Sequence, residues 1–432
     1  MNTHSLLSDY WDEPNYPKIA QYAAKLASTP DITEADLLSS VRSQFGTPQP
    51  KMNMSQQPAP YNIWGKDLIE PAAIEQMETA LRIPPALNGA LMPDAHLGYA
   101  LPIGGVIALD NAISPSYIGY DISCMMMLSV FQLSPKEFTT HKENFAKLLR
   151  ENTHFGIGQG WKRYNHPVLD DERWSISQAV ANQKNKAVEQ IGTSGGGNHF
   201  ADLVLVEGNT PYIGLLTHSG SRGAGHKIAT AYTKLASEET KHVANGIPKE
   251  HGWLKFDTNA GQEYFAAMSL MGEYAYANHE LIHMAFAKAA HLELSVRQVI
   301  WNRHNFAWPT DEGILHRKGA TPAHINELGL IPGTSGTSSY IVRGKGNPNS
   351  LNSSSHGAGR PFSRTAAKKR HDQSAFKQQM ENILHFGVAE DETFLAYKDI
   401  HAVLAEQTDL IEIVAEMKPL VVVMGGRSDD GD

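Results

Sequence analysis

The sequence predicts an α+β fold in which mixed sheets are surrounded by helices. Short apolar runs bounded by Gly, Pro, Asn and Ser alternate irregularly with helical segments, and no regular strand–helix–strand series is visible. In addition, 432 residues with 41% hydrophobic and 19% charged side chains describe a globular chain that can bury a sizeable core. A purely parallel, doubly wound sheet is therefore disfavoured.

Prolines and capping residues predict where helices begin. Pro17 suits the first turn of one helix, and Ser134 followed by Glu137 forms a capping-box pattern at the start of another. A long segment rich in alanine and methionine predicts a further helix. The expected helices are Tyr16–Ala27, Glu70–Leu81, Pro135–Arg150, Gly261–His291 and Lys398–Glu416.

Short apolar runs between turn residues predict the strands. They are Ile103–Leu109, Met125–Leu133, Leu203–Val206, Ile213–Thr217, Gln298–Trp301, Ser339–Arg343 and Leu420–Met424. Because no convincing linker divides the middle of the chain, we expect one catalytic domain over residues 61–426. A polar, turn-rich extension precedes it at 1–60, and a disordered tail follows at 427–432.

Composition limits the class of protein. No apolar run approaches the length of a bilayer span, and the N-terminal residues lack a basic flank followed by an apolar stretch. With a single cysteine, this predicts a cytoplasmic protein without a membrane anchor. The net charge of −9 argues against coating nucleic acid over the whole surface. A local basic patch around Arg360 and Arg364 is about as well explained as a solvated helix start.

Cys124 is the only cysteine, so an intramolecular disulfide is excluded. A packed thiol, a nucleophile and a metal ligand remain as interpretations. Asp121 lies three residues earlier, and one bend can direct both side chains at a single ion. The pair therefore favours the metal-ligand interpretation.

Four histidines share one setting, beside an apolar run and among Gly, Ser or Asn. They are His199, His218, His304 and His356. Any one alone is better explained as a core histidine bonded to a backbone carbonyl, but together with Asp121 and Cys124 they fit a site on loops over a rigid scaffold. Imidazole, carboxylate and thiolate suit Zn, Mn, Fe or Co rather than Ca or Mg. Six candidates exceed one tetrahedral site, which favours two metals, an arrangement typical of phosphoryl chemistry.

Two further segments fit phosphate binding. Gly333–Ser339 offers backbone N–H groups and hydroxyls, and His316–Thr321 adds cationic donors. Each is a weak signal alone, because such loops are also ordinary turns.

These blocks resemble the RtcB family of GTP-dependent RNA ligases. The resemblance rests on blocks that occur in the family's order between about residues 90 and 425: Pro93–Gly98, Gly119–Met125, Gly195–Phe200, His218–Gly223, His304–Asn305, His316–Thr321, Ser355–Arg360 and Ser363–Thr365. It implies RtcB-like mixed sheets with helices around a central metal and nucleotide cleft.

The resemblance also implies a reaction. Two Mn(II) ions would be held, one by Asp121, Cys124 and His199, the other by Cys124, His218 and His304. His356 would attack the α-phosphate of GTP to give a histidine–GMP intermediate. RNA ends with a 2′,3′-cyclic phosphate or 3′-phosphate would then be guanylylated and joined to 5′-hydroxyl ends, in RNA repair or tRNA splicing.

Further residues take roles by the same resemblance. Nucleotide contacts are expected from Asn198, His199, Asp202, Thr334, Ser339, His356, Gly357, Gly359 and Tyr397. RNA or phosphate contacts are expected from Arg222, Lys318, Arg360 and Arg364, whose cationic groups suit phosphate. An archease-like activator is a candidate partner.

The chain departs from the family pattern at three places. Around the thiol the family usually has Gly-Cys-Gly-Met, and here the run is Ser123-Cys124-Met125-Met126. The guanine-reading glutamate is Asp202, and the near-terminal lysine is Met424. The last two changes touch base recognition, so they make a strict GTP preference less secure than the ligase chemistry.

Two other functions are open at the level of sequence. The run His279-Glu280-Leu281-Ile282-His283 matches the HExxH helix of zinc metallopeptidases, although no third ligand motif follows and the helix is alanine-rich. A nucleotide- or RNA-binding homologue without catalysis is the other alternative, which the complete ligand set and His356 disfavour.

Overall fold

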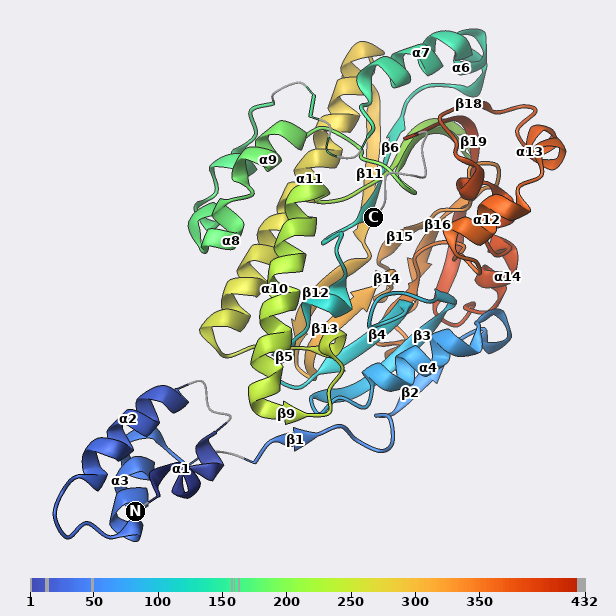
Figure 1. The fold of residues 1–432 in the computed structure, drawn as a ribbon. Coiled ribbons are helices and arrows are strands. Elements are labelled where there is room, and N and C mark those ends of the chain that lie inside the picture. The colour runs from blue at the N-terminus through green and yellow to red at the C-terminus, as the bar shows by residue number, and fades with distance from the viewer. Residues whose placement is uncertain are drawn as a thin grey trace.

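Figure 1 shows the computed structural model of the chain, which describes residues 2–11, 15–47, 50–156, 158, 160–161 and 164–425. The α+β class is confirmed, because helices accompany several mixed sheets. A small helical lobe at the N-terminus stands beside a larger body (Figure 1), and β1 (Met52–Asn53) pairs with β9 (Ala244–Asn245) of that body. The predicted disordered tail, 427–432, lies outside the described residues.

The larger sheet positions the site. Its strands, in spatial order, are β11 (Val296–Arg303), β6 (Met125–Phe131), β8 (Tyr212–Ser219), β7 (Phe200–Val206), β19 (Ile411–Met424), β16 (Ser339–Gly344) and β15 (Leu328–Ile331). Neighbours along this path are antiparallel, and β18 (Leu384–Phe386) adds a parallel pairing to β19. The Leu330 N–H of β15 donates to the Asn302 side chain of β11, so the two edge strands meet and the sheet nearly closes.

The second sheet is connected to the first through β12, which follows β11 almost directly along the chain. Its order is β12 (Asn305–Thr310), β13 (Gly313–Lys318), β4 (Ile103–Leu109), β3 (Ala86–His96) and β2 (Tyr61–Ile63). Only His304 separates β11 of the first sheet from β12 of the second. Two small pairs complete the strands: β10 (Leu254–Lys255) with β5 (Ala112–Ile113), and β14 (Ala320–Pro322) with β17 (Ser353–Ser355).

Two long helices, α10 (Arg222–Val243) and α11 (Asn259–Ala289), lie side by side against the body (Figure 1). Buried apolar side chains such as Ile228 and Met268 join them in one core cluster. The shorter helices of the body are α4 (Pro71–Ala80), α5 (Pro115–Ile118), α6 (Pro135–Thr140), α7 (Lys142–Asn152), α8 (Gln178–Ala181), α9 (Lys184–Gln190), α12 (Arg364–Arg370), α13 (Gln373–Gln379) and α14 (Ile400–Ala405). Single 3-10 turns occupy Ser8–Tyr10, Lys66–Leu68, Pro167–Asp170, Glu172–Ser175, Lys249–His251, Glu293–Ser295, Pro348–Ser350, Glu390–Glu392 and Phe394–Ala396. Within the described ranges, none of the helices is both long enough and apolar enough to cross a bilayer.

The predicted helix Lys398–Glu416 is wrong beyond Ala405. Helix α14 ends there, and β19 begins at Ile411 as a central strand hydrogen-bonded to β16 on one side and to β7 on the other. The β-branched residues Ile411, Ile413 and Val414 suit that extended backbone. Pro419, which cannot donate to the ladder, sits at a register shift. Over Ile411–Glu416, pairing with β16 therefore overrides the local helical pattern, and β7 pairs with the strand from Met417 onward.

Other predicted elements differ in extent. The single helix expected over Pro135–Arg150 is divided into α6 and α7, because His141 leaves the helical conformation between them. The sequence pattern missed α10 altogether.

The N-terminal lobe is more ordered than a turn-rich extension. It contains α1 (Thr3–Leu6), α2 (Tyr16–Ala27) at its predicted bounds, and α3 (Glu34–Phe45), which was not predicted. The Thr33 hydroxyl accepts the Asp36 N–H and caps α3. The helices share a small core that includes Leu7, Tyr10 and Leu37. This lobe therefore has a core of its own.

Candidate active site

Strand ends of the larger sheet bring four predicted ligands together. Cys124 directly precedes β6, His199 directly precedes β7, and His304 directly follows β11. His218 lies in β8 opposite Met126 of β6 on one side and Phe200 of β7 on the other. Because neighbouring strands are antiparallel, the starts of β6 and β7 and the ends of β8 and β11 lie at the same end of the sheet. The geometry of the site is thus a consequence of strand register.

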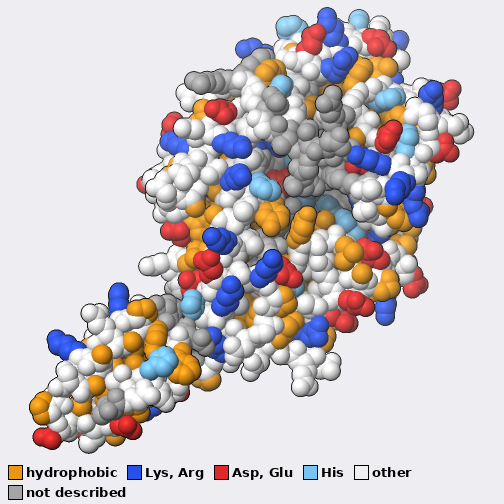
Figure 2. Space-filling model, viewed as in Figure 1, with side chains coloured by type: hydrophobic (Ala, Val, Ile, Leu, Met, Phe, Trp, Pro, Cys, Tyr) orange, Lys and Arg blue, Asp and Glu red, His pale blue; other side chains and the backbone are white. Residues whose placement is uncertain are grey.

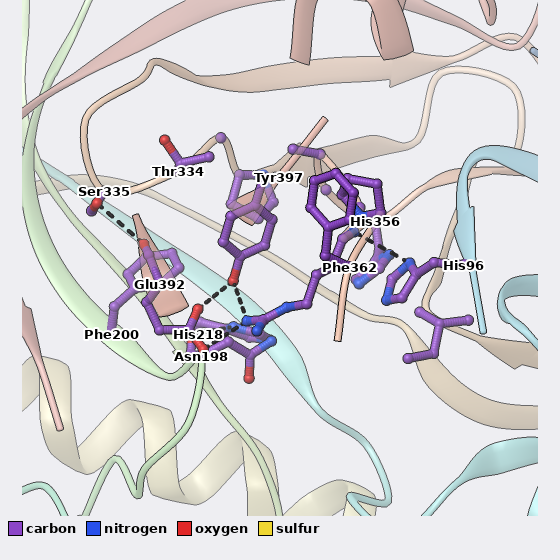
Figure 3. A pocket seen from close by; sticks show the side chains of 18 of the residues that line it. His96, Asn198, Phe200, His218, Thr334, Ser335, His356, Phe362, Glu392 and Tyr397 are labelled. Atoms are coloured by element: carbon purple, nitrogen blue, oxygen red, sulfur yellow. Dashed lines mark hydrogen bonds and ion pairs between the residues drawn. The ribbon is translucent and has the colours of Figure 1, made fainter. Parts of the chain in front are cut away.

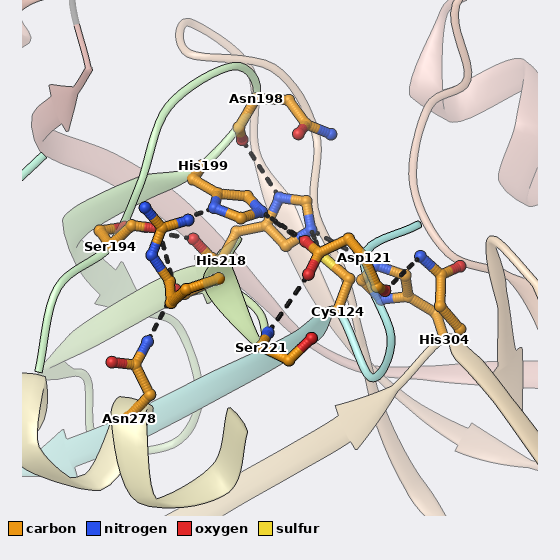
Figure 4. Close-up of polar contacts among 12 residues, drawn as sticks. Asp121, Cys124, Ser194, Asn198, His199, His218, Ser221, Asn278 and His304 are labelled. Carbon is orange, nitrogen blue, oxygen red and sulfur yellow. Dashed lines mark hydrogen bonds and ion pairs between the residues drawn. The ribbon is translucent and has the colours of Figure 1, made fainter. Parts of the chain in front are cut away.

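The ligand atoms form two groups that share the thiol (Figure 4). Cys124, His218 and His304 form one group, and Asp121, Cys124 and His199 the other, with ligand atoms within 4.8 Å of one another in each group. The Cys124 sulfur lies 3.1 Å from His218 Nε2 and 3.5 Å from His199 Nε2. His218 Nε2 lies 3.4 Å from His304 Nε2.

The imidazole tautomers fit metal ligation. His199 donates from Nδ1 to the Ser194 carbonyl over 2.7 Å, and His218 donates from Nδ1 to the Asn198 carbonyl over 3.1 Å. Each Nε2 then carries a lone pair that faces other lone pairs rather than donors. Burial, with a contribution from neighbouring histidines, lowers the pKa of His218 and His304 well below the usual value, which favours neutral rings. A bound cation would satisfy these imidazole lone pairs, which converge beside the Cys124 thiol.

Asp121 completes the second group. Its Oδ2 lies 3.1 Å from His199 Nε2, and its Oδ1 accepts the Ser221 N–H. Burial works to raise the pKa of this carboxyl, but the interactions with His199 and the charge of Arg222 outweigh burial, so the pKa is lowered. An ionised carboxylate is therefore favoured at the candidate metal position.

His356 is held by a carboxyl group that the sequence pattern did not single out. Asp94, in β3, is fully buried, and its Oδ2 lies 2.7 Å from His356 Nδ1. The same oxygen accepts the backbone N–H groups of His356 and Gly357. Since Nδ1 donates to Asp94, Nε2 of His356 is left with the lone pair. The His356 ring centroid lies 5.0 Å from that of His304, next to the candidate metal ligands.

Two adjoining cavities meet at His356. The first has a volume of about 670 Å³, and the second, over the candidate metal ligands, has about 450 Å³. Figure 2 shows histidine side chains at the bottom of a hollow on the face that is seen. His218, Lys318 and His356 line both cavities. His356 therefore lines the region where the two cavities adjoin.

The first cavity contains most of the predicted nucleotide contacts (Figure 3). It is lined by Asn198, Asp202, Thr334, Ser339, His356, Gly357, Gly359 and Tyr397. His199 lines only the second cavity. Phe200 and Phe362 also line the first cavity and offer aromatic faces that the sequence pattern did not assign. The cavity can therefore stack a planar ring as well as bind polar groups.

Asp202 and Met424 are both in the wall of the first cavity. Oδ1 of Asp202 is buried without a hydrogen-bond partner among the described residues. Burial raises the pKa of Asp202 well above its usual value. Met424, which ends β19 opposite Phe200, offers no charge. One carboxyl oxygen without a partner thus lies in the wall of the cavity that a ligand would occupy.

The predicted phosphate contacts occupy different places. Arg222 is buried in the wall of the second cavity, and Lys318 lies between the two cavities, where it donates to the carbonyls of Tyr99 and Ser116. Burial lowers the pKa of Lys318 to about 7. Arg360 lines the first cavity and donates to Glu392 Oε1 over 2.7 Å and to Tyr397 Oη over 3.0 Å. The side chain of Arg364 lies outside the described residues.

Aromatic and basic side chains line the second cavity. The ring of Tyr120 stacks on His226, with centroids 5.1 Å apart, and makes a T-shaped contact with Tyr99, with centroids 5.7 Å apart. Tyr99 is 69% exposed. The cationic lining residues are Lys186, Arg222, Lys227 and Lys318, and Asp121 is the one carboxylate that lines it within the described residues. The cavity therefore favours an anionic ligand with planar rings.

The HExxH histidines are not arranged as zinc ligands. His279 and His283 are buried, and both contact the Thr217 hydroxyl at 2.7 Å. His283 also contacts the Ser129 hydroxyl, and Glu280 lies 3.2 Å from His166. In the described part of the chain, the possible metal-holding groups are the two that contain Cys124. The motif is thus explained by buried hydrogen bonds from its two histidines on α11 to hydroxyl groups of the larger sheet.

Fold and site together define an α+β protein that places two candidate metal-ligand groups beside an aspartate-held histidine. Comparison with known proteins gives the family. Residues 76–425 match the family described as "tRNA-splicing ligase RtcB". The "RNA-splicing ligase RtcB" of Escherichia coli strain K12 is 31% identical over 411 residues, which cover 85% of this chain and 98% of the relative.

Other relatives agree. The "tRNA-splicing ligase RtcB" of Nanoarchaeum equitans is 30% identical over 421 residues, covering 78% of this chain and 87% of the relative. The "RNA-splicing ligase RtcB homolog 1" of Entamoeba dispar is 27% identical over 444 residues, covering 82% of each. The chain belongs to the RtcB family.

Proposed function

We propose that this protein is an RNA ligase that joins 2′,3′-cyclic phosphate or 3′-phosphate ends to 5′-hydroxyl ends through a histidine–GMP intermediate. One observation carries the proposal. His356 is oriented by the fully buried Asp94, lies beside the candidate metal ligand His304, and lines both cavities. This is the arrangement that a nucleophilic imidazole needs.

The first step is guanylylation of His356. Nε2 forms a bond to the α-phosphorus of GTP while the bond from that phosphorus to the bridging oxygen breaks, and pyrophosphate leaves with the electron pair. The Nδ1 proton stays on the ring, which becomes cationic. The carboxyl group of Asp94, 2.7 Å away, stabilises that charge and keeps the ring oriented.

The later steps use the RNA ends. Water first opens a cyclic phosphate to a 3′-phosphate. An oxygen of that phosphate attacks the phosphorus on His356, the P–N bond breaks, and the electron pair returns to Nε2. The 5′-hydroxyl oxygen of the second end then forms a bond to the phosphorus of the guanylylated 3′-phosphate and releases its proton to solvent. The bond from that phosphorus to the GMP oxygen breaks, and GMP leaves with the electron pair. Each product follows from one bond made and one bond broken at phosphorus.

Mn(II) is the proposed cofactor, with two ions held by the two ligand groups that share Cys124. When bound, it supplies Lewis-acid stabilisation of charge on the phosphoryl oxygens. The residues fit this role because the ligand atoms converge, the His218 and His304 rings favour the neutral form, and Asp121 favours the ionised form.

The two cavities suit the two substrates. The first offers Phe200, Phe362 and Oδ1 of Asp202, which has no partner among the described residues, and these groups fit a nucleotide base. The second has more cationic than anionic side chains and is lined by the Tyr120 ring, while the exposed Tyr99 ring lines both cavities; these features fit an RNA end. We therefore assign GTP to the first cavity and RNA to the second. Because Asp202 and Met424 shape base recognition, the strictness for GTP is part of the test.

An RNA-joining assay across nucleotides and metals tests the proposal. A 3′-phosphate strand and a labelled 5′-hydroxyl strand are incubated with GTP, ATP, CTP or UTP and with Mn, Zn, Co or Mg. We expect joined product with GTP and Mn(II), and none with His356→Ala. Joining by His356→Ala, or no joining under any combination, would contradict the proposal.

A further inference from the structure

Asn278 is a fully buried side chain of α11 that holds the loop before His199. Its Oδ1 accepts the N–H of Gly192 over 2.6 Å and that of Thr193 over 3.1 Å. Its Nδ2 donates to the Thr193 carbonyl over 2.8 Å and to the Ser219 hydroxyl over 3.0 Å. One amide group thus makes four hydrogen bonds that fix the loop to the end of β8.

The loop leads directly to a candidate metal ligand (Figure 4). The Ser194 carbonyl accepts the Ser219 hydroxyl over 2.9 Å and His199 Nδ1–H over 2.7 Å. Hydrogen bonds therefore run without interruption from Asn278 through Ser219 and the Ser194 carbonyl to the His199 ring. A histidine ligand needs this kind of support, because the acceptor on its far nitrogen sets both tautomer and orientation.

The dependence on Asn278 is not shared equally by the two ligand groups. His218 is held within β8 by ladder pairing to β6 and β7, and its Nδ1 uses a different carbonyl, that of Asn198. His304 lies between two strands, and its N–H donates to the Cys124 carbonyl. Only His199 receives its Nδ1 acceptor from the segment that Asn278 clamps.

We propose that Asn278 is a positioning residue for His199, and so for the metal position formed by Asp121, Cys124 and His199. The inference rests on the metal centre of the proposed function. It also gives α11 a role beyond packing. His279 contacts the Ser219 carbonyl at 3.2 Å, so part of the HExxH run supports the same strand end instead of binding zinc.

The test measures Mn(II) bound per chain and the affinity of each ion, by equilibrium dialysis with elemental analysis. The variants are Asn278→Ala and Ser219→Ala, and the second removes only the hydroxyl between Asn278 and Ser194. Ser129→Ala is the matched control. It removes a buried hydroxyl of β6 that lies 2.7 Å from His283, a residue of α11 like Asn278, but it removes no hydrogen bond to the loop that contains Ser194.

We expect the natural protein and Ser129→Ala to bind two ions. Asn278→Ala should keep one ion at unchanged affinity and bind the other about 10- to 100-fold more weakly. Ser219→Ala should shift the same ion in the same direction, and it carries the test if Asn278→Ala does not fold. Unchanged binding of both ions in the two variants would overturn the inference, as would equal weakening of both. If the natural protein itself binds no metal, the metal centre of the proposed function fails instead.

Discussion

Replacing Asp94 by asparagine tests the nucleophile most selectively. The substitution keeps the size of a side chain that is fully buried, but it removes the charge opposite His356 Nδ1 at 2.7 Å. A hydrogen bond to a charged group contributes roughly 1.5–3 kcal/mol, which alone slows the step about 10- to 100-fold. If the amide presents its NH₂ to the ring, the tautomer reverses, and the loss can approach about 10⁴-fold.

The assay follows acid-labile label on the protein from α-labelled GTP in a single turnover. We expect the rate constant of labelling to decrease by a factor within that range. The affinity for GTP should change little, since Asp94 is not among the residues that line the first cavity. Asp257→Asn, at an exposed carboxyl group, is the control and should label normally. Labelling of Asp94→Asn at the natural rate would refute the argument that Asp94 sets the tautomer of His356.

Three further predictions follow from local features. Ser123 has φ of 57° and a buried hydroxyl without a partner among the described residues. Ser123→Gly should therefore raise the free energy of unfolding, measured by urea titration, by about 1 kcal/mol. A decrease in that free energy would show that the backbone is not strained at this position. Burial lowers the pKa of Lys318 to about 7, so its charge is lost as pH rises through 7. The Kd for GTP should then rise by up to about tenfold per pH unit above 7, and Lys318→Arg should remove this dependence. A Kd that does not change with pH in the natural protein would exclude a charged Lys318 from GTP binding. Tyr99→Ala should raise the KM for RNA several-fold, and by more than it raises the KM for GTP in guanylylation, since this exposed ring lines both cavities. An unchanged KM for RNA would exclude base stacking on Tyr99.

Local signals predicted part of the fold well. The bounds of α2 were predicted because a proline in the first turn fixes where that helix begins. The error over Lys398–Glu416 has a non-local cause, since the part of β19 in that range is extended through its pairing with β16. Helix α10 was missed because its start is obscured. It begins at Arg222, whose φ is 57°, in a glycine-rich block, although the Ala, Lys and Glu residues farther along favour a helix.

The candidate site shows the same division. Asp121, Cys124, His199, His218 and His304 could be singled out because each lies at or near a strand end among small residues, and the structure brings them together. Asp94 could not be assigned, because it lies within β3 in an apolar run and meets His356 across 262 residues. Asn278 lies in an alanine-rich helix, where a polar side chain is ordinarily assigned to the surface. Long-range partners of buried polar groups have no signature in a single sequence.

The central claim is that His356 carries the nucleotide, and mapping of the labelled residue tests it most directly. The protein is incubated with α-labelled GTP and Mn(II), digested under alkaline conditions that preserve a phosphoramidate, and the labelled peptide is sequenced by mass spectrometry. We predict acid-labile GMP on His356, no label on His356→Ala, and unchanged metal content in that variant. Label on another residue, or full labelling of His356→Ala, would contradict the proposed mechanism.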